Sequence, residues 1–296
     1  MANTFQLVSD LTYWLTTPMG HAFVVVIGLA IGSFLNVVIT RLPKMVERDE
    51  RHLSLQQLNI EPPQVTPLNL AWPLSFCPKC GASIRWRHNI PVFSWIMLGG
   101  RCASCEQPIS VRYPIVEATS ALLLLILFMS YGPSLEFCFK AFFCLGLIAV
   151  AYMDWETGWL PDVATIPLIG AGLLFSVFTV TQLGALSPTD AIIGAVAGYG
   201  LFWLLNFVYR GLTGRNGLGF GDFKLVAALG AWLGWVLLPL NLLFAALIAF
   251  LFGIYMVVAG TYRRDLGIRF APFLSVVGIG LLLVRDLGLL PTYLGG

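Results

Sequence analysis

The sequence predicts an all-α polytopic membrane protein with about eight transmembrane helices and one small cytoplasmic insert. Of its 296 residues, 58% are hydrophobic and only 11% are charged, and the mean hydropathy is +0.83. A water-soluble domain of this size does not need so much apolar surface. Apolar stretches of membrane-spanning length recur along the chain, and a single long polar segment interrupts them.

Eight apolar stretches are expected to form the helices. They cover 21–40, 114–131, 135–153, 163–181, 189–209, 223–238, 240–260 and 270–289. The first stretch lacks the basic flank of a secretory signal, because residues 1–20 carry Asp10 and neither Lys nor Arg. We therefore expect it to remain as a transmembrane helix. The sixth is short for a bilayer and contains Gly230 and Gly234, so we expect it to be tilted or packed inside the bundle.

Two glycine pairs have the spacing that lets helix backbones approach closely. Gly28 and Gly32 lie in the first stretch, and Gly194 and Gly198 lie in the fifth. This spacing is common in membrane helices, and it predicts helix packing rather than chemistry.

The basic residues predict the orientation of the chain. Of the 17 Lys and Arg residues, nine lie in 41–113, three in 210–224 and three in 261–269. With eight crossings these segments share one side of the membrane, and the positive-inside rule makes that side the cytoplasm. Both termini are then periplasmic, and Asp154 and Asp222 lie at the cytoplasmic face.

The polar insert, residues 41–113, has two parts. Residues 44–69 are charged and contain prolines, which predicts a loose linker or a short amphipathic piece. Residues 72–113 form a tighter module. The domain organisation that follows is an N-terminal part with the first helix (1–40), the insert, and a seven-helix core (114–296).

Two CxxC motifs lie in the module, formed by Cys77 with Cys80 and by Cys102 with Cys105. Four thiolates in this pattern predict a closed tetrahedral zinc site, which is structural and supplies folding energy to a small module. The 21 residues between the motifs slightly exceed the usual spacing. A redox dithiol or two disulfides are the alternatives, and a cytoplasmic location disfavours disulfides. Gly81 suits the tight turn after the first pair.

Asp154 ends the third apolar stretch and Asp222 opens the sixth. A charged side chain at a membrane is costly, so each aspartate needs an explanation. Asp222 also fits a helix N-cap after a glycine-rich turn. Asp154 lies at a helix C-terminus, where the macrodipole disfavours a negative charge, and no local structural role for a carboxylate is expected there. Two carboxylates that share one proton can activate water and protonate a leaving amine, with Asp222 as base and Asp154 as acid.

Glycines alternate in front of the second aspartate, at Gly217, Gly219 and Gly221. A backbone with so little side-chain bulk lets a peptide substrate come close. A phosphate-binding loop is the competing interpretation, but the segment lacks the GxxxxGK[ST] pattern and Lys224 follows an acid.

Four segments together resemble a known family. They are GSFLNVVITRLP (32–43), the two CxxC motifs with NIPVFSWIMLGGRC (89–102) and RYPIVE (112–117), AYMDWETGWLPD (151–162), and GLGFGDFK (217–224). In this order they resemble the type IV prepilin leader peptidases, which also serve the pseudopilins of type II secretion.

This resemblance implies an intramembrane aspartyl endopeptidase of the bacterial inner membrane that removes a short basic leader from prepilins and pseudopilins after a glycine. It also implies N-methylation of the new N-terminal residue from S-adenosylmethionine. The family's catalytic aspartates match Asp154 and Asp222, and Asp162 takes a neighbouring secondary position. Trp155 and Trp159 depart from the pattern by their bulk. We expect membrane lipid as a further partner, and no nucleic acid.

Residues near the substrate are expected among Gly219, Gly221, Lys224, Asp162 and Glu117. Glu117, just inside the second stretch, can alternatively pair with Arg112 at the interface. The methyl transfer rests on resemblance alone, since no glycine-rich nucleotide loop follows a strand.

Two other functions compete with the peptidase. A proton-coupled transporter would spread its carboxylates through the membrane depth, whereas Asp154 and Asp222 lie at one edge. A zinc-scaffolded assembly platform without chemistry would leave both aspartates unexplained.

Overall fold

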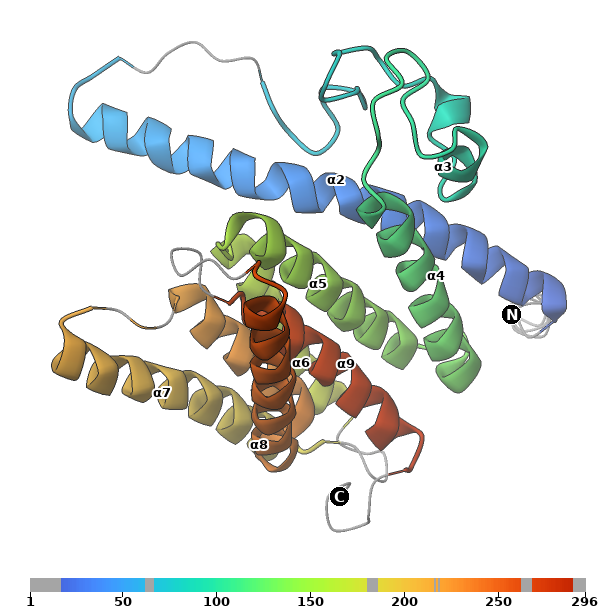
Figure 1. The fold of residues 1–296 in the computed structure, drawn as a ribbon. Helices are drawn as coiled ribbons and strands as arrows, with labels where there is room; N and C mark the ends of the chain where they lie inside the picture. Colours follow the sequence, from blue (N-terminus) through green and yellow to red (C-terminus); the bar gives the residue numbers. More distant parts are fainter. Residues whose placement is uncertain are drawn as a thin grey trace. The chain divides into compact units, whose positions relative to one another are not determined.

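The computed structural model describes residues 17–61, 67–179, 186–215, 217, 219–261 and 268–289, and the regular structure in these ranges is helical except for isolated β-bridges (Figure 1). The elements are α2 (Pro18–Gln57), η1 (Trp86–His88), α3 (Phe93–Met97), α4 (Arg112–Tyr131), α5 (Leu135–Thr157), α6 (Asp162–Phe178), α7 (Pro188–Thr213), α8 (Phe220–Val258) and α9 (Ala271–Asp286). They belong to two compact units, one up to Ala141 and one from Phe142.

The membrane-protein class predicted from the sequence is confirmed. Among the described residues, α2, α4, α5, α7 and α8 are long and apolar enough to cross a membrane, and α6 is apolar but only 17 residues long. All eight predicted stretches fall mainly on helices. The count of eight crossings stays a prediction.

Helix α8 carries two of the predicted stretches in one element. Its 39 residues would span about 58 Å if straight, close to twice the hydrocarbon thickness. Gly234 interrupts the helix with φ 75° and ψ 171°, a conformation that glycine adopts without steric cost. The predicted boundary near Pro239 therefore lies too late in the chain. Residues 225–234 are all buried, so the expectation that the sixth stretch packs inside the bundle is confirmed.

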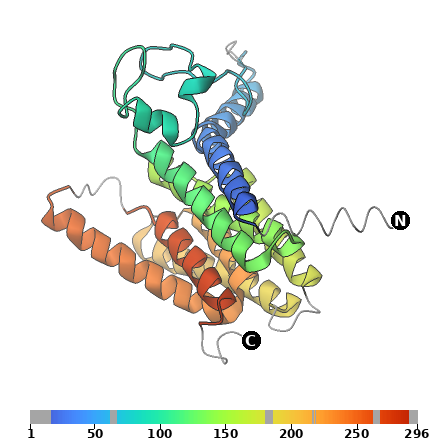
Figure 2. The same ribbon diagram turned by 90° about the vertical axis from the view of Figure 1, so that its right-hand side faces the viewer.

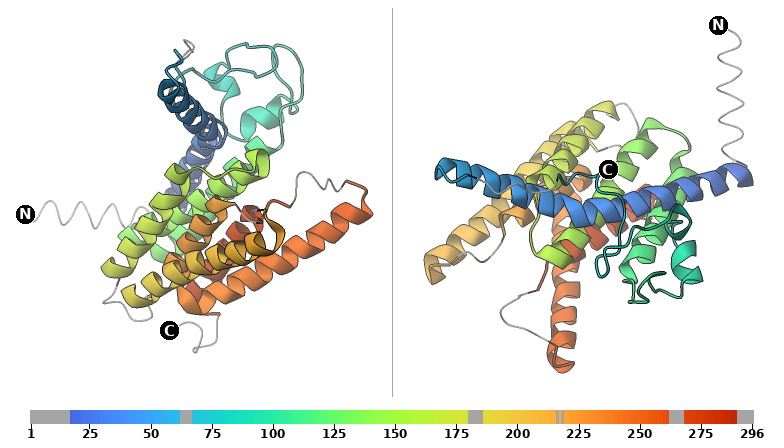
Figure 3. Two further views of the ribbon diagram at one scale, coloured as in Figure 1. Left: turned by 90° about the vertical axis from the view of Figure 1, so that its left-hand side faces the viewer. Right: turned by 90° about the horizontal axis from the view of Figure 1, so that it is seen from above.

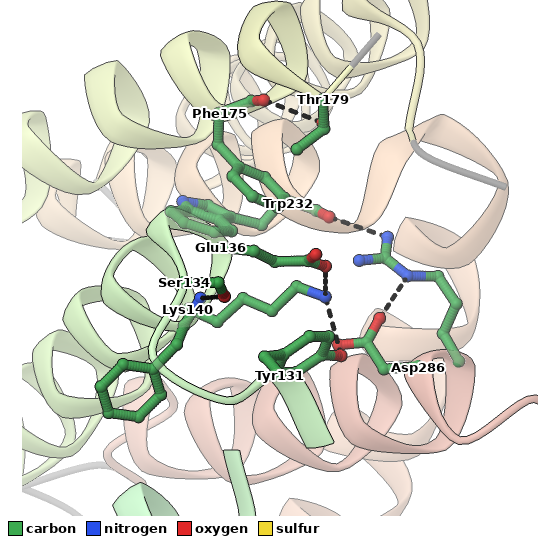
Figure 4. Close-up of polar contacts among 10 residues, drawn as sticks. Tyr131, Ser134, Glu136, Lys140, Phe175, Thr179, Trp232 and Asp286 are labelled. Atoms are coloured by element: carbon green, nitrogen blue, oxygen red, sulfur yellow. Dashed lines mark hydrogen bonds and ion pairs between the residues drawn. The ribbon is translucent and has the colours of Figure 1, made fainter. Parts of the chain in front are cut away.

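Trp232 fixes the buried half of α8 to its neighbours. Its ring stacks on Phe143 of α5 and on Phe175 of α6, with centroids 4.4 and 5.3 Å away. Its Nε1 donates to the Leu168 carbonyl at 2.8 Å. Its own carbonyl, two residues before the break, accepts from Arg285 Nη1 at 3.0 Å (Figure 4). A side chain thus satisfies a carbonyl next to a point where the regular helix ends.

The glycine pairs serve helix packing, as predicted. In the second unit α7 lies along α8 (Figures 1 and 3), and a Cβ on Gly194 would come within 2.3 Å of the Gly230 carbonyl oxygen. In the first unit α2 lies against α4 (Figure 2). A Cβ on Gly28 would come within 2.6 Å of the Ala121 Cα, so only glycine permits this approach.

Helix α2 runs much further than its apolar stretch. It continues to Gln57, so the loose linker, one of the two forms expected for residues 44–69, is wrong for residues 44–57. This part contains neither Gly nor Pro and is rich in helix-forming residues. The returning chain is tied back to the helix by the Arg41 guanidinium, which donates to the carbonyls of Asn69 at 3.0 Å and Pro73 at 2.6 Å.

A buried lysine near the start of α5 has its charge compensated by partners within the first unit. The Lys140 side chain is only 4% exposed, and its Nζ donates to Glu136 Oε1 at 2.7 Å and to the Tyr131 hydroxyl at 2.8 Å (Figure 4). The ammonium also lies over the Tyr131 ring. Pairing of this kind is what allows a charge inside an apolar helix.

Candidate functional site: an aspartate pair and a tetracysteine cluster

Asp154 has a structural partner that the sequence does not reveal. It lies on the last turn of α5 and is only 6% exposed. Its Oδ2 accepts a hydrogen bond from the backbone N–H of Ala271, the first residue of α9, at 3.3 Å. Helix α9 has no capping side chain from its own N-cap residue. The expectation that no structural role awaits a carboxylate at Asp154 is therefore wrong, because it caps a helix that lies 117 residues further on.

Asp222 is the third residue of α8, as the glycine-rich turn predicts. It is half-buried, and its backbone N–H donates to the Gly219 carbonyl at 3.1 Å. Its carboxylate interacts electrostatically with that of Asp154. The two predicted aspartates therefore lie close enough for their charges to interact, Asp154 on the last turn of α5 and Asp222 on the first turn of α8.

Arg269 joins this pair, and the sequence pattern does not single it out. Its guanidinium interacts electrostatically with Asp154. It lies directly over Gly158, where a Cβ would come within 1.3 Å of Nη1. Gly158 ends α5 at φ 69°, and its N–H donates to the Asp154 carbonyl at 2.8 Å. A glycine therefore both ends the helix and leaves the space that the arginine fills.

The other residues expected near the substrate have separate contacts. Asp162, at the first position of α6, forms an ion pair with Lys224 of α8, and its side chain is 58% exposed. A Cβ on Gly221 would come within 2.6 Å of the Leu160 Cβ, so this glycine serves packing. Among the described atoms, a Cβ on Gly219 would meet only the Asp222 carboxylate, at 3.3 Å from Oδ2. Of the two glycines, Gly219 is the one whose Cβ position faces the Asp222 carboxylate.

Glu117 lies in the first unit and holds the insert to the helices. The residue is 7% exposed, and its Oε2 accepts from the Val92 N–H at 2.7 Å, with Ser33 as a further hydrogen-bond partner. Val92 has φ 59°, an uncommon value for a β-branched residue. The hydrogen bond that Val92 donates to Glu117 helps to hold this strained turn, which begins α3.

The four predicted metal-ligating cysteines converge. Their Sγ atoms all lie within 4.8 Å of one another, and those of Cys77 and Cys105 are 3.9 Å apart. Tetrahedral zinc with Zn–S bonds of about 2.3 Å separates its sulfurs by about 3.8 Å. A disulfide would need about 2 Å, and all four cysteines are free. The donor set and its geometry fit a structural zinc ion.

Each CxxC motif lies in a turn of the same form. Gly81 donates its N–H to the Cys77 carbonyl, and Glu106 donates to the Cys102 carbonyl, both at 2.9 Å. Both residues have positive φ, 71° at Gly81 and 57° at Glu106. The turn predicted at Gly81 is confirmed, and the second turn places a glutamate where the first has a glycine.

The thiols of the cluster influence one another strongly. The pKa of Cys77 is lowered to about 6, mainly because the backbone N–H groups of Cys80 and Lys79 donate to its sulfur. At Cys105 the backbone N–H of Gln107 lowers the pKa, but desolvation and the other thiols raise it more, to about 12. The cluster therefore favours the thiolate form of Cys77 and disfavours that of Cys105. A bound cation would stabilise both thiolates.

The comparisons with known proteins cover nearly the whole chain. The model of the bacterial peptidase A24 N-terminal domain matches residues 26–131, and the model of the type IV leader peptidase family matches residues 141–254. No solved structure is significantly similar to the chain.

Curated relatives carry the name prepilin leader peptidase/N-methyltransferase. The protein from Aeromonas hydrophila is 41% identical over 87% of this chain and 88% of its own length. The one from Pseudomonas aeruginosa is 39% identical over 90% and 92%, and the one from Dickeya chrysanthemi is 41% identical over 97% and 96%. Matches of this extent and identity mean that the chain belongs to the type IV leader peptidase family.

Proposed function

We propose that this protein is a prepilin leader peptidase and N-methyltransferase of the bacterial inner membrane, and that Asp154 and Asp222 carry the cleavage. The names of the relatives support both activities and prepilins as substrates. Pseudopilins are proposed as further substrates from the resemblance of the sequence motifs alone. The single observation that supports the site is the convergence of the two aspartates at three helix ends. Family membership favours hydrolysis over the proton-coupled transport that the sequence left open.

The surroundings of the pair suit one shared proton and one negative charge. Two adjacent carboxylates resist ionising together, so one acts as acid and the other as base. The Ala271 N–H at the start of α9 donates to Asp154, and the Gly219 N–H at the N-cap of α8 donates to Asp222. Both helix N-termini would stabilise the remaining charge. Arg269 adds a positive charge beside Asp154. In this proposal Asp222 takes a proton from the attacking water, and Asp154 gives one to the leaving amine.

The decisive experiment compares three asparagine variants, with leader removal from a prepilin followed by gel in nanodiscs. Asp154→Asn and Asp222→Asn should lower the cleavage rate by about 100-fold or more. The amide introduced by Asp154→Asn still offers an oxygen to the Ala271 N–H, so the cap on α9 is kept. The matched control is Asp162→Asn, at an exposed aspartate in an ion pair, which should keep most activity. Cleavage at the parental rate by either of the first two variants would refute the assignment.

The insert is proposed to hold one structural zinc ion on Cys77, Cys80, Cys102 and Cys105, and S-adenosylmethionine is proposed as the methyl donor. Metal analysis should find about one zinc per chain. Cys77→Ser and Cys102→Ser should lose the zinc and lower the folded yield, because the metal stabilises a module with little core. A parent protein without zinc would contradict this. Transfer of a labelled methyl group to the cleaved pilin tests the second activity.

A further inference from the structure

A small apolar surface lies on the insert, outside the helices that are long enough to cross a membrane. Helix α3 exposes Phe93, Ile96 and Met97 by 57%, 64% and 69%, and their spacing places them on one face of the helix. Trp86 of η1, which contacts α3, is 82% exposed. We call these four residues the α3 face.

Helix α3 has two unlike sides. Trp95 points into the module, where its Nε1 donates to the Ile109 carbonyl at 3.2 Å and its ring lies within 2.8 Å of a Cβ position on Gly100. The α3 face makes up the opposite, outward side. Large apolar side chains gathered on an exposed surface mark an interaction site rather than a core.

The contact with Glu117 places α3 at a defined depth. Val92, the residue before α3, donates to Glu117 Oε2 at 2.7 Å. Glu117 is the sixth residue of α4, about 7.5 Å along a helix that can cross a membrane. Helix α3 therefore begins beside the first two turns of α4 (Figure 2). A membrane crossed by α4 would have its headgroups near the first turns of this helix, and tryptophan and amphipathic segments gather at that level.

The charges around the α3 face select among possible partners. Arg85 and Arg87 flank Trp86 and are exposed, and Glu106 is the only acidic residue of the sequence between 67 and 111. A basic border attracts anionic headgroups. It would repel the basic leader that the family resemblance implies for the substrate. The charge therefore favours lipid over prepilin.

We propose that the α3 face lies in the membrane interface and binds anionic phospholipid, with Arg85 and Arg87 at the headgroups and Glu117 holding α3 at this depth. The zinc module would then rest on the bilayer next to α4. This inference does not depend on the catalytic assignment of the aspartates.

The test uses the full chain in nanodiscs that contain brominated phospholipids, which quench nearby tryptophan fluorescence. The contribution of Trp86 is obtained by subtracting the fluorescence emission of the Trp86→Phe variant from that of the parent protein. Phosphatidylglycerol brominated near the headgroup end of its acyl chain should quench this difference more than the same lipid brominated near the terminal methyl. It should also quench about twofold more than equally brominated phosphatidylcholine at the same mole fraction.

Matched variants separate the contribution of the two arginines from that of the apolar side chains. Arg85→Gln with Arg87→Gln should remove the preference for phosphatidylglycerol and leave the shallow quenching in place. Trp203, half-exposed on α7, gives the positive control through Trp203→Phe. Zinc content checks that each variant is folded.

Two results would overturn the proposal. The first is a Trp86 emission that brominated lipids leave unchanged and aqueous iodide quenches, which would place the α3 face in water. The second is a Trp86 emission that brominated lipids do not quench before prepilin is added, and that neither brominated lipid nor iodide quenches afterwards. That result would assign the surface to the substrate.

Discussion

At Gly158 the absence of a side chain decides the surroundings of Asp154. Arg269 fills the space that any other residue would occupy, and there it adds a positive charge beside the carboxylate. Gly158→Ala should therefore displace the guanidinium and lower the cleavage rate, in addition to straining the backbone by roughly 1–3 kcal/mol. Steady-state cleavage and a thermal unfolding curve, measured on the same preparation, separate the two effects.

The matched control is Gly214, which ends α7 at φ 71° and has no atom of the described residues within 4 Å of the position that a Cβ would take. Gly214→Ala carries the backbone strain alone. Equal losses of activity in the two variants would mean that Arg269 does not act on the pair.

The aspartates and cysteines could be found from sequence because each has a local signal, a charge at the end of an apolar stretch or a repeated CxxC. The residues that contact them could not be found from sequence. The Ala271 N–H that Asp154 caps is 117 residues away, and the Lys224 that pairs with Asp162 is 62 residues away. Contacts of this kind depend on how helices pack, and no pattern within one helix encodes them.

At the scale of elements, the two CxxC turns show how one backbone form tolerates different residues. Glu106 holds φ 57° where Gly81 holds φ 71°, and the left-handed region costs a side-chain-bearing residue roughly 1–2 kcal/mol. Glu106→Gly should therefore relieve this strain, while glycine also raises the conformational entropy of the unfolded chain. The net stabilisation of the module should be up to about 1 kcal/mol.

Chelator-induced zinc release measures this difference, and Glu106→Gly should slow it. Gly81→Ala is the reciprocal change and should speed zinc release, since a Cβ there meets none of the described atoms within 4 Å and only the backbone strain acts. Faster zinc release from Glu106→Gly than from the parent would disprove the equivalence of the two turns.

Helix ends were the least predictable feature among the elements. Apolar periodicity locates the part of α2 that contacts α4, but the helix continues to Gln57 through a charged segment that shows no such periodicity. The break in α8 lies at Gly234 rather than near Pro239, because packing favours a left-handed glycine there and the helix accommodates the proline. The extension of α2 is mostly exposed and follows from its helix-forming residues, whereas the break in α8 lies among buried residues.

For the whole molecule, the distribution of basic residues makes a testable statement about sidedness. Fifteen of the 17 Lys and Arg residues lie in three segments that we propose to be cytoplasmic. Alkaline phosphatase, which is active only outside the cytoplasm, should be active when fused after the C-terminus and inactive when inserted at 62–66. The reverse pattern would invert the topology and place the aspartate pair on the periplasmic side.

The crossing of α7 and α8 limits how this protein can change over evolutionary time. At most contacts a larger residue on one helix can be matched by a smaller one on the other, so the two positions drift together. Gly194 and Gly230 each approach the carbonyl oxygen of the other, at 2.3 and 2.1 Å from a Cβ position. No residue is smaller than glycine, so neither position can compensate for its partner. This crossing can only be kept as it is or be lost.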